Sequence, residues 1–268
     1  MSEGLDPRML LRGYAAGIFP MADSRHAGDI FWVEPRSRAI IPLDRFHLSR
    51  SLARRIRSGR FTVTRDRAFH QVLLACADRE ETWINAMIER ATLGLHAVGH
   101  AHSIECWHDG ELVGGLYGVK LGGAFFGESM FSRMTDASKV ALAWLVARLR
   151  VGHFTLLDCQ FMTPHLASLG ATTVSRDQYI GLLSSALSSA GSGEGGVSAG
   201  GAASLPVDGV SAGAASLPPP PEFDALDRLL DATGAAGAAG AAGQLIAQLL
   251  GQTSYTASST TLSDGLSL

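Results

Sequence analysis

The stretch HSIECWHDGELVGGLYGVKLGGAFFGESM, residues His102–Met130, holds the pattern around which this chain folds. It contains three consecutive strand-like runs, His102–Trp107, Leu112–Val119 and Ala124–Met130. The polar turn HDGE between the first two runs favours a hairpin, because an Asp-Gly turn supplies the backbone twist that paired antiparallel strands need. The three runs therefore predict an antiparallel meander at the centre of the domain.

Segments with helical periodicity and further short strands surround this meander. Helices are predicted at Pro7–Ala16, Ser49–Arg57, Phe69–Ala77, Trp83–Ala97, Asp136–Arg150 and Pro164–Leu169, with Asp136 as the N-cap of the fifth. Strands are predicted at Phe31–Val33, Ala39–Ile41, Phe61–Thr64 and Phe154–Leu157. This order of elements predicts an α+β fold in which helices cover a mixed sheet.

Length and composition narrow the class of protein. The chain has 268 residues, of which 46% are hydrophobic, so it can fill the core of one large domain or two small ones. Fibrous and wholly disordered classes are excluded. No apolar run approaches the roughly 20 residues of a membrane span, and the N-terminus lacks the pattern of a signal peptide. Three widely spaced cysteines match neither a disulfide framework nor a zinc site, so we expect a reduced, cytoplasmic protein without a membrane partner.

The composition changes near residue 190. Gly, Ala, Ser and Pro dominate from there on, with two copies of a repeat at Gly196–Pro206 and Gly209–Pro218. Such a segment buries too little apolar surface to offset its ordering entropy, so residues 191–268 are predicted to be a disordered tail. Two short amphipathic pieces within it, Phe223–Leu230 and Gln244–Leu250, can dock on the core.

The first stretch with chemical interest is GGAFFGESMFSRMTDASK at Gly122–Lys139. Glu128 lies there among apolar strand residues, where a carboxylate is costly unless it meets a cation or hydrogen-bond donors. Glu128 is therefore a candidate functional carboxylate, and the alternative is a structural ion pair with Arg133.

The second stretch is LLDCQFMTPHLASLGA at Leu156–Ala171. On a strand, Asp158 and Gln160 point to one face and Cys159 to the other. A carboxylate beside an amide fits a positioning pair for acyl transfer. A Cys159 thiol with His165 as its base is an alternative, although a buried cysteine is the simpler interpretation.

Three further groups of residues have both a functional and a structural interpretation. The histidine-rich segment His96–His108 has the composition of a metal site, but it contains neither a CxxC nor an HExxH motif, so no metal is expected. Trp32 and Trp83 can stack a nucleic-acid base or belong to the core. Five arginines on one predicted helix and its end fit either phosphate contacts or a solvated face: Arg50, Arg54, Arg55, Arg57 and Arg60.

Several collinear motifs resemble the bacterial leucyl/phenylalanyl-tRNA–protein transferases. They cover about residues 5–185 and include GYAAGIFPM (Gly13–Met21), FWVEPRSRAIIP (Phe31–Pro42), TWI (Thr82–Ile84), GHAHSIECW (Gly99–Trp107), LVGGLYGVKLG (Leu112–Gly122), GESMFS (Gly127–Ser132), DASK (Asp136–Lys139), LDCQ (Leu157–Gln160) and HLASLGA (His165–Ala171). The tail beyond about Ala190 has no counterpart in the family.

The resemblance implies an acyltransferase that moves Leu or Phe, and less well Met, from leucyl-tRNA or phenylalanyl-tRNA. The acceptor is the α-amino group of proteins with N-terminal Arg or Lys, and the product is marked for N-degron proteolysis. It also implies an acetyltransferase-like (GNAT) catalytic domain at residues 61–190 after a small N-terminal α/β domain at residues 1–60. No cofactor is implied, and the family precedent is a cytoplasmic monomer.

The resemblance also implies roles for individual residues. Asp158 and Gln160 match the catalytic pair, in which Gln160, polarised by Asp158, assists removal of the amine proton. Glu128 and Asp158 match the partners of the acceptor's cationic side chain, and Trp32, Trp83 and Ser132 match residues near the terminal adenosine. The arginines of the basic helix become candidates for the tRNA backbone. The aminoacyl pocket is expected to consist of Phe125, Met130, Leu142, Leu145, Leu149 and Leu157.

Two alternatives stay open at this point. One is a related enzyme that uses another acceptor of aminoacyl groups, such as a peptidoglycan precursor, although Glu128 favours a cationic acceptor. The other is a tRNA-binding module without catalysis, against which the intact Asp158, Gln160 and Glu128 argue.

Overall fold

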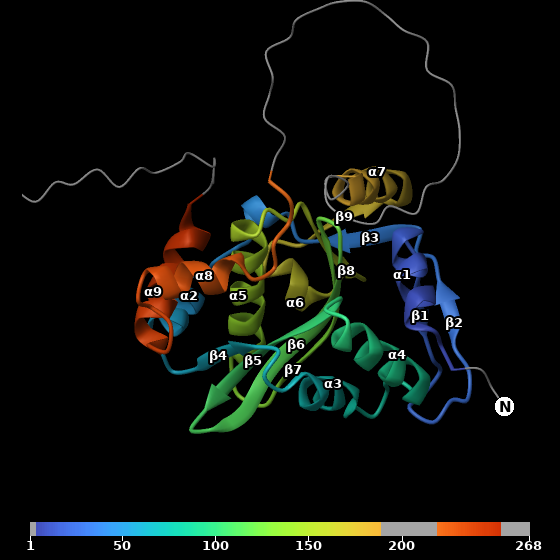
Figure 1. Ribbon diagram of the computed structural model, residues 1–268, viewed down its shortest axis with the longest axis horizontal. Coiled ribbons are helices and arrows are strands. Elements are labelled where there is room, and N and C mark those ends of the chain that lie inside the picture. The colour runs from blue at the N-terminus through green and yellow to red at the C-terminus, as the bar shows by residue number, and fades with distance from the viewer. Residues whose placement is uncertain (1–3, 189–218, 253–268) are drawn as a thin grey trace, which may run out of the picture.

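A computed structural model describes residues 4–188 and 219–252 of the protein. Its main element is a seven-stranded sheet (Figure 1). In spatial order the strands are β4 (Thr62–Arg65), β5 (Ala101–His108), β6 (Glu111–Leu121), β7 (Ala124–Ser132), β8 (Leu156–Gln160), β3 (Ser37–Ile40) and β9 (Thr172–Ser175). A separate two-stranded sheet pairs β1 (Phe19–Met21) with β2 (Phe31–Val33).

The predicted meander is confirmed in β5, β6 and β7, which pair antiparallel in sequence order. Asp109 and Gly110 both have positive φ, at 50° and 82°, in the tight turn that closes the first hairpin. β7 and β8 are the parallel pair of the sheet, and the helix α5 (Ala137–Val151) connects them. The mixed sheet of an α+β fold follows from this one crossover.

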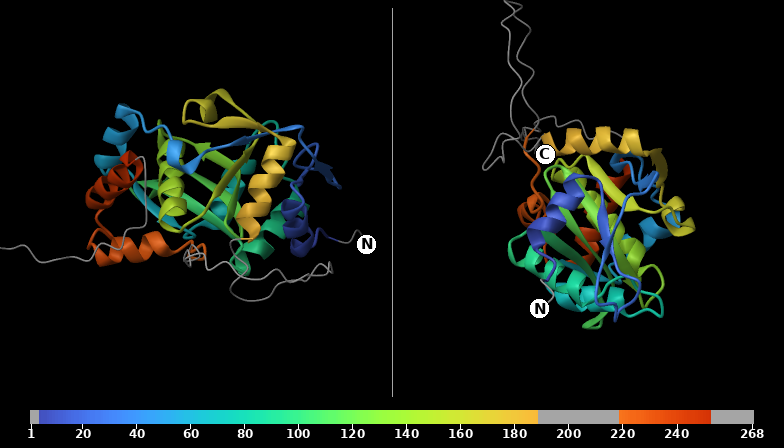
Figure 2. Two further views of the ribbon diagram at one scale, coloured as in Figure 1. Left: turned by 90° about the horizontal axis from the view of Figure 1, so that it is seen from above. Right: turned by 90° about the vertical axis from the view of Figure 1, so that its right-hand side faces the viewer.

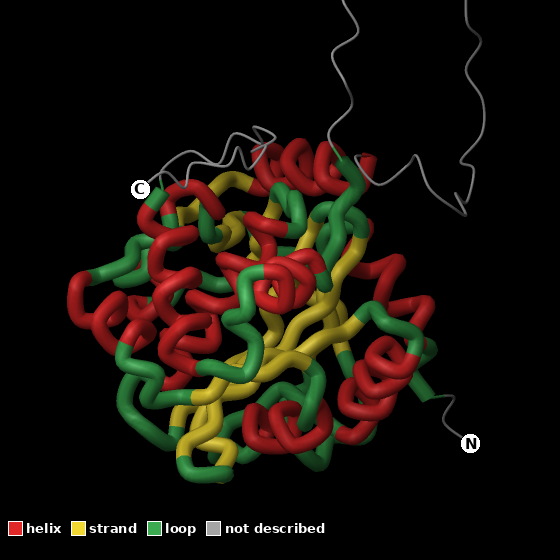
Figure 3. Tube along the Cα trace, turned by 60° about the vertical axis from the view of Figure 1, so that its left-hand side comes forward, coloured by secondary structure: helices red, strands yellow, loops and turns green. Residues whose placement is uncertain are grey.

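Helices cover both faces of the sheet (Figures 2 and 3). On one face α5 packs on the meander together with α2 (Arg50–Arg57). On the other face lie α1 (Pro7–Ala15), α3 (Phe69–Ala77), α4 (Ala86–Ala97) and α7 (Arg176–Ser188). Neighbouring strand residues supply the two cores, since Phe125 belongs to the first and Phe126 to the second. The 3₁₀ turn Leu43–Arg45 and the short helix α6 (Pro164–Ala167) complete this part of the chain.

The prediction of disorder after residue 190 is wrong for residues 219–252. There α8 (Ala225–Ala232) and α9 (Ala239–Gly251) pack beside α5 and α2, so the docking of the two amphipathic pieces is confirmed. Phe223 is 2% exposed and stacks on Phe125. The two copies of the repeat and residues 253–268 lie outside the described residues.

Polar contacts fix the same segment in place. The buried guanidinium of Arg148 donates to the carbonyl of Phe223 at 2.7 Å and to Asp227. At Gly243, a Cβ would lie 2.2 Å from the carbonyl oxygen of Ile56, so the α9–α2 contact requires glycine there. A few well-placed apolar and charged contacts therefore hold a segment whose composition is otherwise typical of a disordered tail.

One further expectation is corrected, and another is confirmed in part. β3 belongs to the large sheet, so residues 37–60 lie with the segment expected as the catalytic domain and the predicted boundary at residue 60 does not separate the two sheets. Asp136 occupies the N-cap position of α5, as predicted, but it has φ of 72° and its carboxylate pairs with Arg55 at 3.3 Å instead of making a capping hydrogen bond. No helix within the described ranges is long and apolar enough to cross a membrane.

Candidate active site

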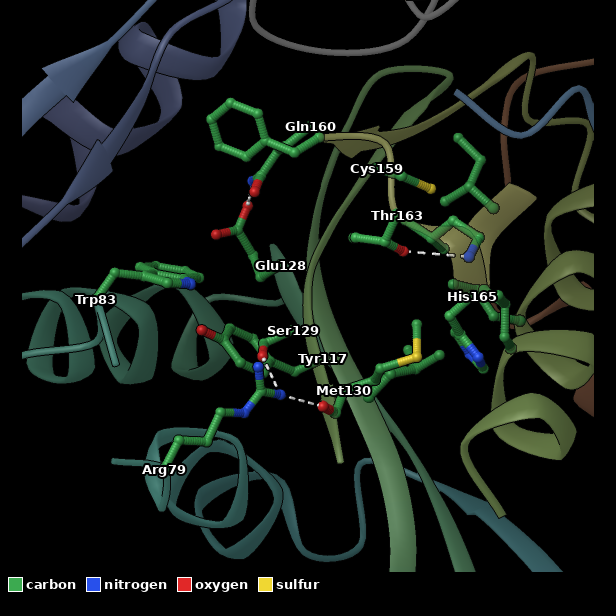
Figure 4. A pocket seen from close by; sticks show the side chains of 17 residues that line it. Arg79, Trp83, Tyr117, Glu128, Ser129, Met130, Cys159, Gln160, Thr163 and His165 are labelled. Carbon is green, nitrogen blue, oxygen red and sulfur yellow. Dashed lines mark hydrogen bonds between the residues drawn. The ribbon is translucent and has the colours of Figure 1, made fainter. Parts of the chain in front are cut away.

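The cavity of interest opens where β7 and β8 diverge. The two strands pair only from Ala124 to Phe126, against Leu156 to Asp158, and then separate. Residues beyond the last pair, Glu128 on β7 and Gln160 on β8, line a cavity of about 230 Å³. Because the gap interrupts the sheet, side chains from both cores reach the same space (Figure 4).

The cavity is apolar inside and polar toward one side. Its apolar lining comes from Leu116, Met130, Leu142, Leu145, Leu157 and Leu166. Its polar lining includes Arg79, Glu128, Ser129 and Gln160, with Trp83 and Tyr117 beside them. This division fits a ligand with an apolar side chain and a polar reacting end.

Glu128 and Gln160 face each other across the gap (Figure 4). The side-chain amide of Gln160 donates from Nε2 to Glu128 Oε1 at 2.8 Å. Burial raises the pKa of the Glu128 carboxyl to about 8, against the hydrogen bonds from Tyr14 and Gln160. The alternative ion pair with Arg133 is absent from the described residues, where Arg133 instead lies over the ring of Phe131.

Gln160 has an unusual backbone. Its φ is 63°, a left-handed conformation that is strained for a residue with a side chain. The amide of Phe161 bonds back to the carbonyl of Cys159 at 2.7 Å, so the strand turns sharply at this position. The turn directs Gln160 toward Glu128, while the side chain of Cys159 lies on the other side of the strand and lines another part of the same cavity (Figure 4).

Asp158 lies behind Gln160 and does not line the cavity. It is 0% exposed, and its carboxylate accepts from Arg38, from the hydroxyl of Tyr179 at 3.0 Å and from the backbone amide of Gln160 at 2.8 Å. Burial lowers the pKa of Arg38, but its hydrogen bonds with Asp158 outweigh this and raise the pKa overall. The carboxylate of Asp158 is therefore already occupied by partners within the protein, which corrects the expectation that it contacts the acceptor's cation. Its contact with Gln160 is to the backbone N–H of that residue.

Four of the six expected aminoacyl-pocket residues line the cavity: Met130, Leu142, Leu145 and Leu157. Phe125 and Leu149 do not, because both are fully buried in the core on the α5 side of the sheet. Leu116 and Leu166 complete the apolar lining instead. Strand and helix periodicity identifies apolar positions but does not tell which of them border a gap between strands.

The expected nucleotide-binding residues separate in the structure. Trp83 lines the cavity, whereas Trp32 packs over Gly13 in the small sheet region, so close that a Cβ on Gly13 would lie 2.3 Å from the indole. Ser132 does not reach the cavity either, since its hydroxyl bonds to the carbonyl of Met134 and the amide of Ser138.

The basic helix presents most of its arginines to solvent. Arg50, Arg54, Arg57 and Arg60 are exposed, while Arg55 is half-buried against Asp136. Leu52 and Ile56 face inward on the same helix. The described residues thus contain an exposed cationic surface on α2, which we call the α2 arginine face.

Neither alternative chemistry is favoured by the structure, although Cys159 and His165 both line the cavity (Figure 4). Burial and the charge of Asp158 raise the pKa of the Cys159 thiol, the opposite of what a thiolate nucleophile needs. The histidines of His96–His108 have separate partners: His96 stacks on Phe69, and His102 bonds to Asp66 at 2.7 Å. Within residues 4–188 and 219–252, no three histidines, cysteines or acids converge on a common point.

Sequence reasoning missed Arg38, Tyr179, Tyr117 and Arg79. Arg38 was the most visible of them, as a cation at the start of the apolar run Ala39–Ile41. It is 1% exposed between the rings of Phe19 and Tyr179. The other three carry no local signal, because their partners lie far away in the sequence.

Comparison with known proteins finds one family along most of the chain. The family model for the leucyl/phenylalanyl-tRNA protein transferases matches residues 40–184, and the model for the N-terminal domain of these proteins matches residues 3–36. The chain is 66% identical over 189 residues to the leucyl/phenylalanyl-tRNA–protein transferase of Rhizorhabdus wittichii, covering 69% of this chain and 76% of the relative. The corresponding protein of Zymomonas mobilis is 61% identical over 193 residues, covering 70% and 72%. Among solved structures, L-PGS from Bacillus licheniformis matches 62% of this chain and 56% of its own, with 15% identity and a TM-score of 0.35.

These matches show that the protein is an aminoacyltransferase. The chain belongs to the leucyl/phenylalanyl-tRNA–protein transferase family. Both family models end before α8 and α9, so these docked helices lie outside the matched region.

Proposed function

We propose that this enzyme moves leucine or phenylalanine, and less well methionine, from aminoacyl-tRNA to the α-amino group of proteins with N-terminal Arg or Lys. The product then carries an apolar N-terminus that marks it for N-degron proteolysis. As expected from the sequence, the enzyme acts as a cytoplasmic monomer. The observation that carries the proposal is the Glu128–Gln160 pair beside a cavity lined by leucines.

The apolar interior supports the choice of donor. Leu142, Leu145 and Leu157 border the cavity without a buried charge among them. Burying an apolar side chain without a branch at Cβ in such a space is favourable by about 25 cal/mol per Å² of apolar surface removed from water. Polar aminoacyl groups lose their hydrogen bonds with water there, which disfavours them.

The polar side supports the choice of acceptor. Glu128 is the carboxylate that lines the cavity, and its ionised form is stabilised by a cation at this position. An N-terminal Arg or Lys side chain supplies that cation close to the reacting amine. Binding of the acceptor therefore lowers the pKa of Glu128 and favours the form that holds the acceptor.

The chemistry needs positioning more than a strong base. The amine nitrogen attacks the ester carbonyl, a C–N bond forms, the bond to the ribose oxygen breaks, and that oxygen takes up the amine proton. Since Gln160 donates from Nε2 to Glu128, its amide oxygen is left to accept a hydrogen bond from the incoming amine. A neighbouring ribose hydroxyl of the tRNA can carry the proton to the leaving oxygen.

Asp158 acts in this proposal as a positioning residue. It accepts the backbone N–H of Gln160 and is itself held by Arg38 and Tyr179. These contacts support the strained turn at Gln160 and hence the direction of its side chain.

The tRNA is proposed to contact two surfaces. The ring of Trp83 offers a stacking surface for the terminal base beside the cavity. The α2 arginine face offers cations for the phosphate backbone. We also infer an acetyltransferase-like catalytic fold, which the mixed sheet and its helices on both faces support.

The test is transfer of labelled leucine from leucyl-tRNA to a peptide with N-terminal Arg. An N-acetylated copy and a copy with N-terminal Glu serve as controls. Label on the free Arg peptide alone supports the proposal. Bound tRNA without label on any peptide would favour a binding module, and label on a peptidoglycan precursor would favour the other acceptor class.

A further inference from the structure

Arg79 is a cation of the cavity lining that the proposed chemistry does not use. It follows the end of α3, and its Nη2 donates to Ser129 Oγ at 3.1 Å and to the carbonyl of Met130. In Figure 4 it approaches the cavity from the same side as Trp83, with the guanidinium next to the ring of Tyr117.

The charge of Arg79 is not compensated by a carboxylate. No acid of the described residues lies within ion-pair distance of its guanidinium, even though Asp78 and Glu80 are its chain neighbours. Its two acceptors, a hydroxyl and a carbonyl, are neutral. An exposed guanidinium held by neutral groups beside a binding cavity retains donors and charge for an anionic ligand.

Arg79 also connects the cavity with a second hollow. That hollow, of about 430 Å³, has Arg25, Asp78, Arg79 and Glu80 as its charged lining residues. Arg25 is already paired with Glu89, and the two acids there repel an anion. An anion is therefore favoured at the Arg79 guanidinium, at the junction of the two spaces, rather than deeper in the hollow.

We propose that Arg79 binds the phosphodiester that joins the terminal nucleotide of the donor tRNA to the nucleotide before it. This inference rests on the proposed function. If the aminoacyl chain fills the apolar interior and the terminal base stacks on Trp83, the 5′ phosphate of that nucleotide lies one ribose away from the ester. Arg79 is the guanidinium that the cavity presents on the Trp83 side, and its planar fork matches two phosphate oxygens.

The experiment compares two minimal donors that differ in this phosphate and the cytidine attached to it. One is leucyl-adenosine, and the other is the leucyl ester of cytidylyl-(3′→5′)-adenosine. With an N-terminal Arg peptide as acceptor, kcat/KM is measured for each donor, and their ratio gives the advantage conferred by the added nucleotide. Leucyl-tRNA serves as the reference donor.

The variants are Arg79→Gln, Arg79→Lys and the control Arg90→Gln, which removes an exposed arginine from α4. We expect wild type to favour the dinucleotide donor about tenfold, Arg79→Gln to bring the ratio close to one, and Arg79→Lys to retain part of it. Arg90→Gln keeps the wild-type ratio.

Three results would overturn the inference. If Arg79→Gln keeps the wild-type ratio of kcat/KM between the two donors, either Arg79 only holds Ser129 and Met130 in place or the enzyme recognises the cytidine and not the phosphate. A wild-type ratio of one means that the phosphate is not bound. Failure of wild type with leucyl-tRNA itself removes the proposed function, and the inference with it.

Discussion

The carboxylate of Asp158 is held by the guanidinium of Arg38, with Nε 2.9 Å from Oδ1 and Nη2 2.6 Å from Oδ2. The two residues are 120 positions apart and at most 1% exposed. Arg38 also donates to the carbonyl of Gly17 at 2.9 Å. One ion pair thus ties the small N-terminal region, β3 and β8 together directly behind Gln160.

Removing one partner of this pair should destabilise the protein strongly. Asp158→Asn leaves the Arg38 charge buried without compensation, and we expect a loss of about 3–5 kcal/mol in the free energy of unfolding, measured in urea. The double variant Arg38→Met/Asp158→Leu should recover most of that stability but not transfer, since the amide of Gln160 loses its acceptor. Recovered transfer in the double variant would show that the pair is only structural.

The strained backbone at Gln160 gives a second prediction. Gln160→Gly and Gln160→Ala both remove the side-chain amide and should both abolish most transfer. Because glycine adopts positive φ without strain, the glycine variant should be about 1 kcal/mol more stable than the alanine variant. Thermal unfolding of the two variants decides this, and the opposite order would contradict the left-handed conformation.

The raised pKa of Glu128 predicts a pH-dependent stability. The pKa of the Glu128 carboxyl is about 8 in the folded protein and near 4.5 in the unfolded chain, so the folded state favours the protonated form. The carboxyl therefore destabilises the folded protein above pH 4.5, and this effect grows until about pH 8. Glu128→Gln should therefore raise Tm relative to wild type by more at pH 9 than at pH 5.

The control for this series is Glu111→Gln, which changes an exposed acid at the start of β6. Its Tm difference from wild type should not vary with pH in the same way. A pH-independent difference for Glu128→Gln would mean that the cavity leaves this carboxyl fully solvated.

The cavity lining predicts a change in donor preference. Leu145→Ala enlarges the space and should raise the ratio of phenylalanine to leucine transfer several-fold, whereas Leu145→Phe should lower it. Competition between the two charged tRNAs measures the ratio. Leu149→Val is the matched control, because Leu149 is buried on α5 but does not line the cavity, and a shift of the ratio in that variant would contradict the placement of the pocket.

The docking of α8 and α9 predicts that substitutions there change the stability of the whole domain, although both helices lie beyond the residues that the family models match. Phe223→Ala removes an aromatic ring that stacks on Phe125 and should cost about 3–5 kcal/mol in unfolding free energy. Arg228→Ala on α8 removes only exposed ion pairs and should leave stability nearly unchanged. Equal effects of the two substitutions would mean that α8 does not dock in solution.

The local elements and the family membership follow from the order of residues alone. The Asp-Gly turn and the runs around it predicted the meander β5–β7, because strand alternation and turn chemistry are encoded in adjacent residues. The period-2 argument predicted Asp158 and Gln160 on one face and Cys159 on the other, but Gln160 and Cys159 both line the cavity and Asp158 does not, because the positive φ of Gln160 interrupts the strand alternation. The docking of Phe223–Leu230 was predictable from its amphipathic pattern.

The way in which these elements form a site depends on the packing of distant segments. Leu157 and Phe125 are apolar partners in the paired part of β8 and β7, yet Leu157 lines the cavity and Phe125 is buried in the core. The side-chain partners of Asp158, Arg38 and Tyr179, lie 120 and 21 residues away in the sequence, so the pattern of residues around Asp158 does not predict them. Such contacts form only when the whole chain has folded, because the order of residues along any one element does not specify its neighbours in space.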